Sequence, residues 1–337
     1  MMKKIKLLTA CAMILTIATS VFATMTLNGA GATFPYPIYA KWASVYAKEK
    51  GVQINYASIG SGGGVRQFTA GTVDFGASDA AMSDEEMKKA GSDVLHIPMV
   101  MGAVAVVYNC PEVASLKLDG KTLAEIFMGD IKKWNDPKIA ALNKGVSFPD
   151  KNIVVAHRSD GSGTTDIFTN YLAKVSTPWA SKVGAGKSVA WPVGIGGKGN
   201  EGVAGVVKMN KGSLGYVELA YAKTNKLSMT AMKNRSGYFV IPSPEGTTSA
   251  ADKALKNMPA DFRAEILNQP GKDAYPISGF TWILVHKNQS NKESGAALKN
   301  FLKWAVTDGQ QYASSLDYAQ LPESLSVKIV ETLNTIE

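Results

Sequence analysis

The chain alternates short runs rich in Val, Ile, Tyr and Phe with stretches whose apolar residues recur at helical spacing, along most of its 337 residues. The strand-like runs lie at 52–59, 73–77, 153–157, 214–218 and 280–286. Strands that alternate with helices are typical of α/β proteins, in which helices cover a mainly parallel sheet. The sequence therefore predicts an α/β fold with mainly parallel sheets.

The first 23 residues have the pattern of a secretory signal peptide. Three lysines precede an apolar run that ends in the small-residue motif Val21-Phe22-Ala23. Leu8-Thr9-Ala10-Cys11 has the form of a lipobox, but the apolar run continues well past Cys11. No later stretch is apolar for the roughly 20 residues that cross a bilayer. We expect an exported chain with residues 1–23 removed and no membrane span in the mature part.

Length and the lack of a linker set the expected domain organisation. Removal of the signal peptide leaves 337 − 23 = 314 residues, more than the roughly 250–300 at which a single core stops growing. Neither a Pro/Ser-rich tract nor a charge run separates two halves, which favours domains joined by crossing strands. Candidate crossings lie near 96–101 and 275–279. We predict lobe I at 24–98 and 276–337, and lobe II at 99–275.

Composition narrows the class of ligand. The net charge of +8 falls to 8 − 3 = +5 without the signal lysines, and no run of Lys or Arg occurs, so nucleic-acid binding is not expected. Cys110 would be the only cysteine of the mature chain, which excludes an internal disulfide. The histidines at 96, 157 and 286 are too far apart for metal-ligand spacing. We predict no metal and no cofactor.

Three segments rich in Gly, Ser and Thr each follow a strand-like run or turn and open a helix. They are Gly29–Pro35, Ile59–Gly64 and Asp160–Thr165. A helix N-terminus presents unpaired backbone N–H groups and partial positive charge, and glycine lets an anion approach that backbone closely. One such segment is usually an ordinary turn with a helix cap. Three of them together predict an oxyanion site.

Ionisable residues beside these segments refine the ligand. Asp79 ends the run 73–79, and Arg158 and Asp160 flank the third segment. The guanidinium fork of arginine suits phosphate. A carboxylate repels an anion unless the ligand carries a proton that the carboxylate accepts. Because phosphate carries a proton at neutral pH and sulfate does not, Asp79 favours inorganic phosphate.

The chain does not carry the motifs of several enzyme classes in the form or context that these motifs require. Ser61 and Ser162 lie between glycines, but neither fits the G-x-S-x-G nucleophile motif. Gly194–Gly199 fits G-x-G-x-x-G, yet Trp191-Pro192 interrupts the strand that should precede it, so we interpret 194–199 as a mobile loop. A secreted phosphatase would need a nucleophile with a base, or paired metals. We therefore predict a binding protein with no catalytic residue.

Several motifs, in this order along the chain, resemble the periplasmic phosphate-binding proteins of phosphate-specific ABC transporters. The matching segments are Gly29–Pro35, Gly60–Val65, Val73–Asp79, Gly129–Trp134, Arg158–Thr164, Trp191–Gly194 and Leu316–Pro322. The resemblance implies a type II periplasmic binding fold: two α/β lobes joined by crossing hinge strands, with the ligand cleft between them. It also implies a monomer in the periplasm that delivers phosphate to the inner-membrane permease of an ABC importer.

The same resemblance implies a role for each site residue. Thr33 and Phe34 would donate backbone N–H groups, Ser61 would donate from its hydroxyl and backbone, and Asp79 would accept the phosphate proton. Arg158, held by Asp160, would be the lone cation, and Ser162, Gly163 and Thr164 would form the third helix N-terminus. The chain departs from the family at Gly62, where a serine is common, and at His157, where a basic residue is usual.

Two alternatives stay open at this point. Another oxyanion, such as molybdate, tungstate or sulfate, is the nearest alternative ligand, and Asp79 argues against it. A secreted adhesin or sensor that reuses this fold is the other alternative, because a surface patch leaves little trace in a sequence.

Overall fold

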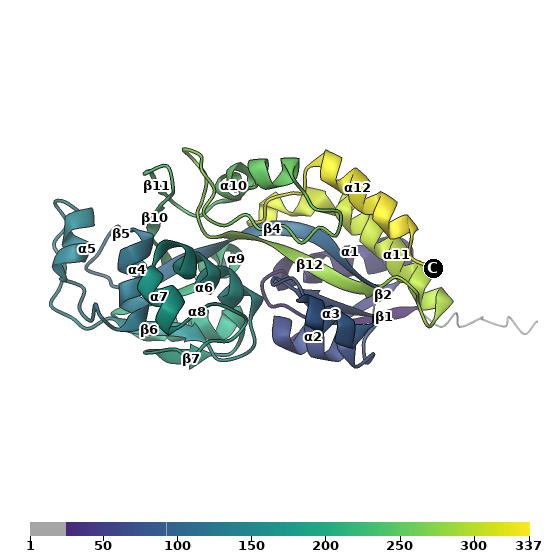
Figure 1. Ribbon diagram of the computed structural model, residues 1–337, viewed down its shortest axis with the longest axis horizontal. Helices are drawn as coiled ribbons and strands as arrows, with labels where there is room; N and C mark the ends of the chain where they lie inside the picture. The colour runs from purple at the N-terminus through teal and green to yellow at the C-terminus, as the bar shows by residue number, and fades with distance from the viewer. Residues whose placement is uncertain (1–24, 92) are drawn as a thin grey trace, which may run out of the picture.

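The structure, a computed structural model, describes residues 25–91 and 93–337. The predicted signal peptide, residues 1–23, lies outside the described residues. Two long strands connect two halves of the molecule (Figure 1). No helix of the described part combines the length and the hydrophobicity needed to cross a membrane.

Each half has its own strands and covering helices. The β1 half contains β1 (Thr26–Gly31), β2 (Gln53–Ser58), β3 (Phe75–Ser78), α1 (Tyr36–Lys50), α2 (Ser61–Thr69), α3 (Asp84–Ala90), α11 (Lys292–Val306) and α12 (Glu323–Asn334). The β6 half contains β6 (Val154–Arg158), β7 (Ile195–Gly197), β8 (Ser213–Glu218), β9 (Ser228–Met229), α4 (Gly120–Met128), α5 (Pro137–Leu142), α6 (Gly163–Val175), α7 (Thr177–Lys182), α8 (Gly199–Met209) and α9 (Leu219–Thr224). A small sheet of β5 (Lys117–Leu118), β10 (Ala231–Lys233) and β11 (Phe239–Val240) flanks the β6 half.

The connection between the halves is made by β4 (Val94–Asn109) and β12 (Ser278–His286). The main sheet has the order β2-β1-β3-β12-β4-β8-β6-β7, with β9 also paired to β4. Up to Ala103, β4 pairs with β12, and from Val104 onward it pairs with β8. Helix α10 (Pro244–Lys256) packs on β4. The lobe boundaries drawn from the sequence stay a prediction.

Strand direction departs from the sequence expectation. Within each half the neighbours are parallel, as in β1 with β2 and β3, and β6 with β7 and β8. Both connecting strands are antiparallel to their neighbours, so the expectation of mainly parallel sheets is wrong and the sheet is mixed. The physical reason is the topology: β4 leaves the β1 half and β12 returns to it, so the two strands run in opposite directions.

All five strands expected from the sequence are present. They are β2, β3, β6, β8 and β12, with ends that lie within two residues of the expected ranges. Their Val, Ile, Tyr and Phe side chains fit the pleated, half-buried surface of a sheet. The local pattern was therefore sufficient to place these five strands, whereas the other strands, β4 among them, were not among the expected runs.

Large aromatic side chains fill the core of both halves. Trp42, Trp134 and Trp179 are fully buried, and their indole N–H groups donate to the carbonyls of Gly309, Gly212 and Gly184. A buried aromatic ring contributes about 4–6 kcal/mol of transfer free energy, before conformational entropy is subtracted. Such packing makes each half a rigid support for the loops at its sheet edge.

Candidate anion-binding site

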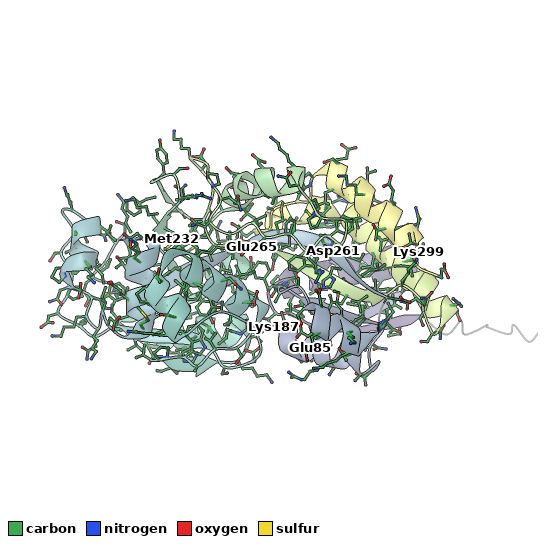
Figure 2. The ribbon with its side chains drawn as sticks, viewed as in Figure 1. Glu85, Lys187, Met232, Asp261, Glu265 and Lys299 are labelled. Carbon is green, nitrogen blue, oxygen red and sulfur yellow. The ribbon has the colours of Figure 1, made fainter. Side chains whose placement is uncertain are left out.

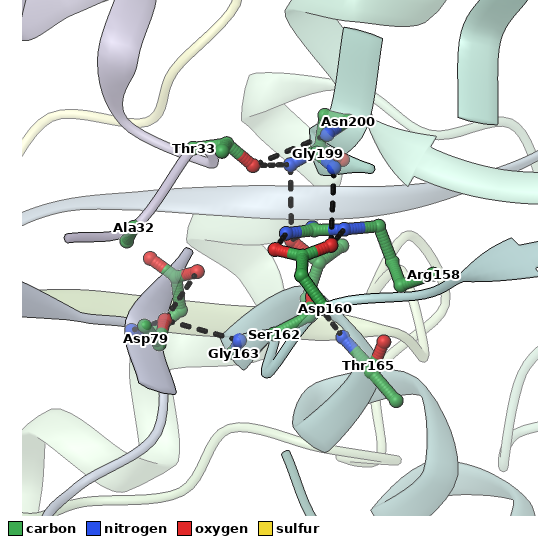
Figure 3. Close-up of polar contacts among 12 residues, drawn as sticks. Ala32, Thr33, Asp79, Arg158, Asp160, Ser162, Gly163, Thr165, Gly199 and Asn200 are labelled. Carbon is green, nitrogen blue, oxygen red and sulfur yellow. Dashed lines mark hydrogen bonds and ion pairs between the residues drawn. The ribbon is translucent and has the colours of Figure 1, made fainter. Parts of the chain in front are cut away.

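The three glycine-rich segments meet where the two halves face each other. Figure 3 shows residues of the first and third segments, among them Thr33 and Gly163, near Asp79. The segments follow β1, β2 and β6 and lead into α1, α2 and α6. All nine residues predicted for the site lie in or beside these segments, and all except the partly exposed Asp160 are buried. The nine residues are Thr33, Phe34, Ser61, Asp79, Arg158, Asp160, Ser162, Gly163 and Thr164. The structure thus brings together residues more than a hundred positions apart in the sequence.

Hydrogen bonds join the segments across the two halves. Gly62 N–H donates to the Gly161 carbonyl at 2.9 Å, and Gly163 N–H donates to Ser61 Oγ at 3.0 Å. Gly60 has a φ of 83°, and a Cβ there would lie 2.3 Å from Asp160 Oδ2. Only glycine has both this backbone conformation and the space for so close an approach.

An ion pair also crosses between the halves. Lys187, labelled in Figure 2, pairs with Glu86 of α3 in the β1 half. With the glycine contacts, this pair shows that the structure holds the two halves closed on each other.

Arg158 is fixed in one orientation by Asp160. The guanidinium donates from Nε to Asp160 Oδ1 at 2.8 Å and from Nη2 to Oδ2 at 2.6 Å. Burial raises the pKa of Asp160, but hydrogen bonds and charge from Arg158 outweigh burial and hold that pKa below its usual value. Nη1 points on to Thr164 Oγ1 at 3.3 Å. The pair expected from the sequence is present, and it balances the arginine charge while leaving one edge of the guanidinium directed at the site.

Three hydroxyl groups in the site share one hydrogen-bonding pattern. Each accepts two N–H donors: Thr33 Oγ1 from Asn200 N and Nδ2, Thr164 Oγ1 from Arg158 Nη1 and Asn200 Nδ2, and Ser61 Oγ from Asp79 N and Gly163 N. A hydroxyl has two acceptor positions and one O–H donor. With both acceptor positions used, each hydroxyl can act only as a donor toward a further group.

Backbone donors add to this set. The N–H groups of Thr33, Phe34, Ser61 and Thr164 donate to no described residue. Buried backbone N–H groups are nearly always paired, so unpaired groups gathered at one place indicate a site built for an acceptor. Hydroxyl and backbone donors together create a strongly donating environment.

Asp79 is the acceptor in this environment. Its side chain is buried, with Oδ1 accepting from Thr281 Oγ1 at 2.8 Å and Oδ2 accepting from Ser61 Oγ at 3.4 Å, so the Ser61 hydroxyl donates to this carboxyl group in the present structure. Burial raises the pKa of Asp79 to about 7, although the hydrogen bond from Thr281 and the charge of Arg158 lower it. The carboxyl group is therefore poised to exchange a proton near neutral pH.

Two residues of the third helix N-terminus already have protein partners. Ser162 Oγ caps α6 by accepting from Thr165 N–H at 3.0 Å, and Ser162 N–H donates to the Lys187 carbonyl. Gly163 N–H donates to Ser61, as described above. Their direct contact with a ligand stays a prediction, whereas Thr164 presents an unpaired N–H and a donating hydroxyl.

Asn200 is a site residue that the sequence reasoning missed. It is fully buried at the start of α8, and it joins the threonine hydroxyls of both halves. The interpretation of 194–199 as a mobile loop is wrong, because residues 195–197 form β7, paired with β6, and Gly199 begins α8. A glycine-rich strand-to-helix turn was the available signal, but β7 is too short to show a strand pattern.

The site offers no metal centre. Among residues 25–91 and 93–337, no group of three or more His, Cys, Asp or Glu side chains is arranged to hold a metal ion. His157, which precedes Arg158, stacks on Trp191 with ring centroids 4.8 Å apart. The chemistry of the site thus consists of hydrogen-bond donors, one ion pair and one carboxyl group.

Known proteins match nearly the whole chain. A model of the PBP superfamily domain matches residues 17–309. The phosphate-binding protein PstS of Pasteurella multocida is 49% identical over 328 residues, which are 96% of this chain and 95% of the relative. PstS of Haemophilus influenzae is 50% identical over 312 residues, 92% of this chain and 93% of the relative.

Solved structures share the fold at lower identity. A high affinity periplasmic phosphate-binding protein bound with phosphate has a TM-score of 0.75 at 20% identity, over 90% of this chain and 93% of that one. A phosphate-binding protein from Stenotrophomonas maltophilia has a TM-score of 0.71 at 19% identity, over 91% of this chain and 93% of the other. At these identities the likeness establishes the arrangement of the two halves and their connecting strands.

Proposed function

The chain belongs to the PstS family of phosphate-binding proteins and has the type II periplasmic binding fold expected from its sequence, and on this premise we propose that it binds inorganic phosphate reversibly between its halves. The relatives are named as binding proteins, and this chain is a binding protein rather than an enzyme. Thr33, Phe34, Ser61 and Thr164 donate to the anion, beside the guanidinium of Arg158.

The observation that carries this proposal is the count of donors against acceptors. Three hydroxyls whose acceptor positions are filled, and four backbone N–H groups with no partner among the described residues, share the site with Asp79, a buried carboxyl group outside the Arg158–Asp160 ion pair. A fully deprotonated tetrahedral anion accepts hydrogen bonds from these donors but has no proton to donate to an ionised carboxylate. A phosphate that keeps a proton satisfies both, because its P–OH donates to Asp79.

Discrimination against sulfate follows from the same carboxylate. A site that needs a donor from its ligand rejects an analogue lacking that donor by roughly 10⁴–10⁵, since a buried acceptor is left unpaired beside an anion. The raised pKa of Asp79 adds a pH dependence. Below about pH 7 the carboxyl group becomes protonated and can donate to sulfate, so sulfate binding should strengthen as the pH falls.

Calorimetric titration of the phosphate-stripped protein tests the proposal. We expect one-to-one phosphate binding at pH 8 with negligible sulfate heat, and measurable sulfate binding at pH 5. Asp79→Asn should narrow the preference for phosphate, whereas Asp130→Asn, at an exposed position, should leave it unchanged. Equal binding of both anions by the wild-type protein at pH 8 would exclude the assigned role of Asp79.

The second part of the proposal concerns delivery. A binding protein that closes on phosphate can present it, in the periplasm, to the inner-membrane permease of an ABC importer. We expect crosslinking to a phosphate permease to depend on phosphate. Crosslinking that is indifferent to phosphate would contradict docking of the closed form.

A further inference from the structure

Three tyrosine hydroxyls contact three consecutive backbone carbonyls of the loop between β1 and α1. The pairs are Tyr56 with Ala32 at 2.7 Å, Tyr221 with Thr33 at 2.6 Å, and Tyr318 with Phe34 at 2.6 Å. The tyrosines come from β2, from α9 and from the segment before α12, so three distant parts of the chain converge on one short loop. None of the three has a place in the donor set described above.

The geometry of the peptide group gives these contacts a consequence. In a trans peptide the C=O and the following N–H point in opposite directions, and the described chain has no cis peptide bond. A hydroxyl that fixes the Ala32 carbonyl therefore fixes the direction of the Thr33 N–H. Likewise, the hydroxyl on the Thr33 carbonyl fixes the direction of the Phe34 N–H. The Phe34 carbonyl precedes Pro35, which has no N–H, so Tyr318 anchors the loop without aiming a donor.

We propose that Tyr56 and Tyr221 are positioning residues that aim and polarise the two backbone N–H groups of the anion site. This inference rests on the proposed function, because it assigns those N–H groups to phosphate. A hydrogen bond to the carbonyl of a peptide strengthens the donor at its other end, since hydrogen bonds in series polarise one another. The tyrosine hydroxyls thus strengthen the Thr33 and Phe34 N–H groups as donors without binding the ligand themselves.

The two tyrosines act from different sides of the cleft. Tyr56 lies in β2, in the same half as the loop, and holds the Thr33 N–H whether the halves are open or closed. Tyr221 lies in α9 of the β6 half and reaches the loop only when the halves are together. Closure therefore aligns the Phe34 N–H. Through Tyr221, the direction of this donor depends on whether the two halves are together.

Tyrosine-to-phenylalanine variants test the inference by removing only the hydroxyl. We expect Tyr56→Phe and Tyr221→Phe each to weaken phosphate binding about tenfold in calorimetric titration, the effect of one well-placed hydrogen bond. Tyr108→Phe is the matched control: its buried hydroxyl donates to the Val113 carbonyl at 3.2 Å, outside the donor set of the site. It should change the affinity less than about twofold.

Amide NMR of the phosphate-saturated protein separates aiming from general loosening. Tyr56→Phe should shift mainly the amide proton of Thr33, and Tyr221→Phe mainly that of Phe34, while Tyr108→Phe shifts neither. Thermal unfolding of the phosphate-free variants measures the cost common to any lost buried hydroxyl.

Each outcome has a distinct meaning. Wild-type affinity and unmoved amides in both site variants would overturn this inference while the wild-type titration upholds phosphate binding. Equal weakening in all three variants would also overturn it, because a general structural effect would then explain the loss. No phosphate binding by the wild-type protein would overturn the proposed function and this inference with it.

Discussion

Replacement of Asp79 by asparagine should change the pH dependence of folding stability by a predictable amount. Burial raises the pKa of this carboxyl group from 3.8 to about 7 in the folded protein. A group whose pKa is raised by folding gives its full stabilisation below the unfolded pKa and loses it as the pH rises through the folded pKa. The wild-type protein therefore loses stability from Asp79 between about pH 4 and pH 7, whereas a neutral amide contributes no such loss.

The magnitude follows from the shift itself. One pKa unit corresponds to 1.36 kcal/mol, so a shift of about 3 units gives a difference of about 4 kcal/mol. We expect the free energy of unfolding of Asp79→Asn, relative to wild type, to rise by about 3–4 kcal/mol from pH 4 to pH 8. Taking the difference between the two proteins cancels the titration of other groups.

Urea denaturation of phosphate-free protein at a series of pH values is the assay. Phosphate must be removed, because a ligand that binds only the folded state adds its own pH-dependent stabilisation. Asp130→Asn, which replaces an exposed carboxylate, serves as the control and should follow the wild-type curve. A relative change below about 1 kcal/mol in Asp79→Asn would show that the carboxyl group is well solvated or well paired when ionised, and would refute the reasoning.

Three further predictions concern residues outside the expected set. Asn200→Ala removes the amide that donates to both threonine hydroxyls, and should weaken phosphate binding about 10–100-fold by calorimetry; unchanged affinity would mean that those hydroxyls are ordered without it. Burial raises the pKa of Glu218 well above its usual value, so Glu218→Gln should gain stability over wild type as the pH rises from 5 to 9 in urea denaturation, and a gain on acidification would contradict this. Trp42→Ala should cost about 3–5 kcal/mol in the same assay with little change in phosphate affinity, and a loss below about 1 kcal/mol would mean that the core collapses around the gap.

Local patterns in the sequence predicted much of the fold and of the site. Strand-forming runs identified five strands, because β-branched and aromatic side chains fit a sheet wherever it lies. Arg158 and Asp160 are two residues apart, so their pairing needed little tertiary information. Strand direction was predicted less well. β4 and β12 are antiparallel because one leaves the β1 half and the other returns to it, and a local sequence pattern contains no information about such a path.

The sequence by itself determined which residue types stand at the ends of strands and at the starts of helices, since those preferences depend on neighbours along the chain. Only the tertiary structure decided which groups meet and which donors stay unpaired. Thr281 lies 202 positions from Asp79, and Asn200 lies 167 positions from Thr33. Such contacts depend on the pairing of β12 with β3 and on the packing of the two halves against each other, and the raised pKa of Asp79 arises from its burial in the folded chain. Hydrogen bonding and desolvation act through space, which is why the chemistry of this site became visible only in the folded chain.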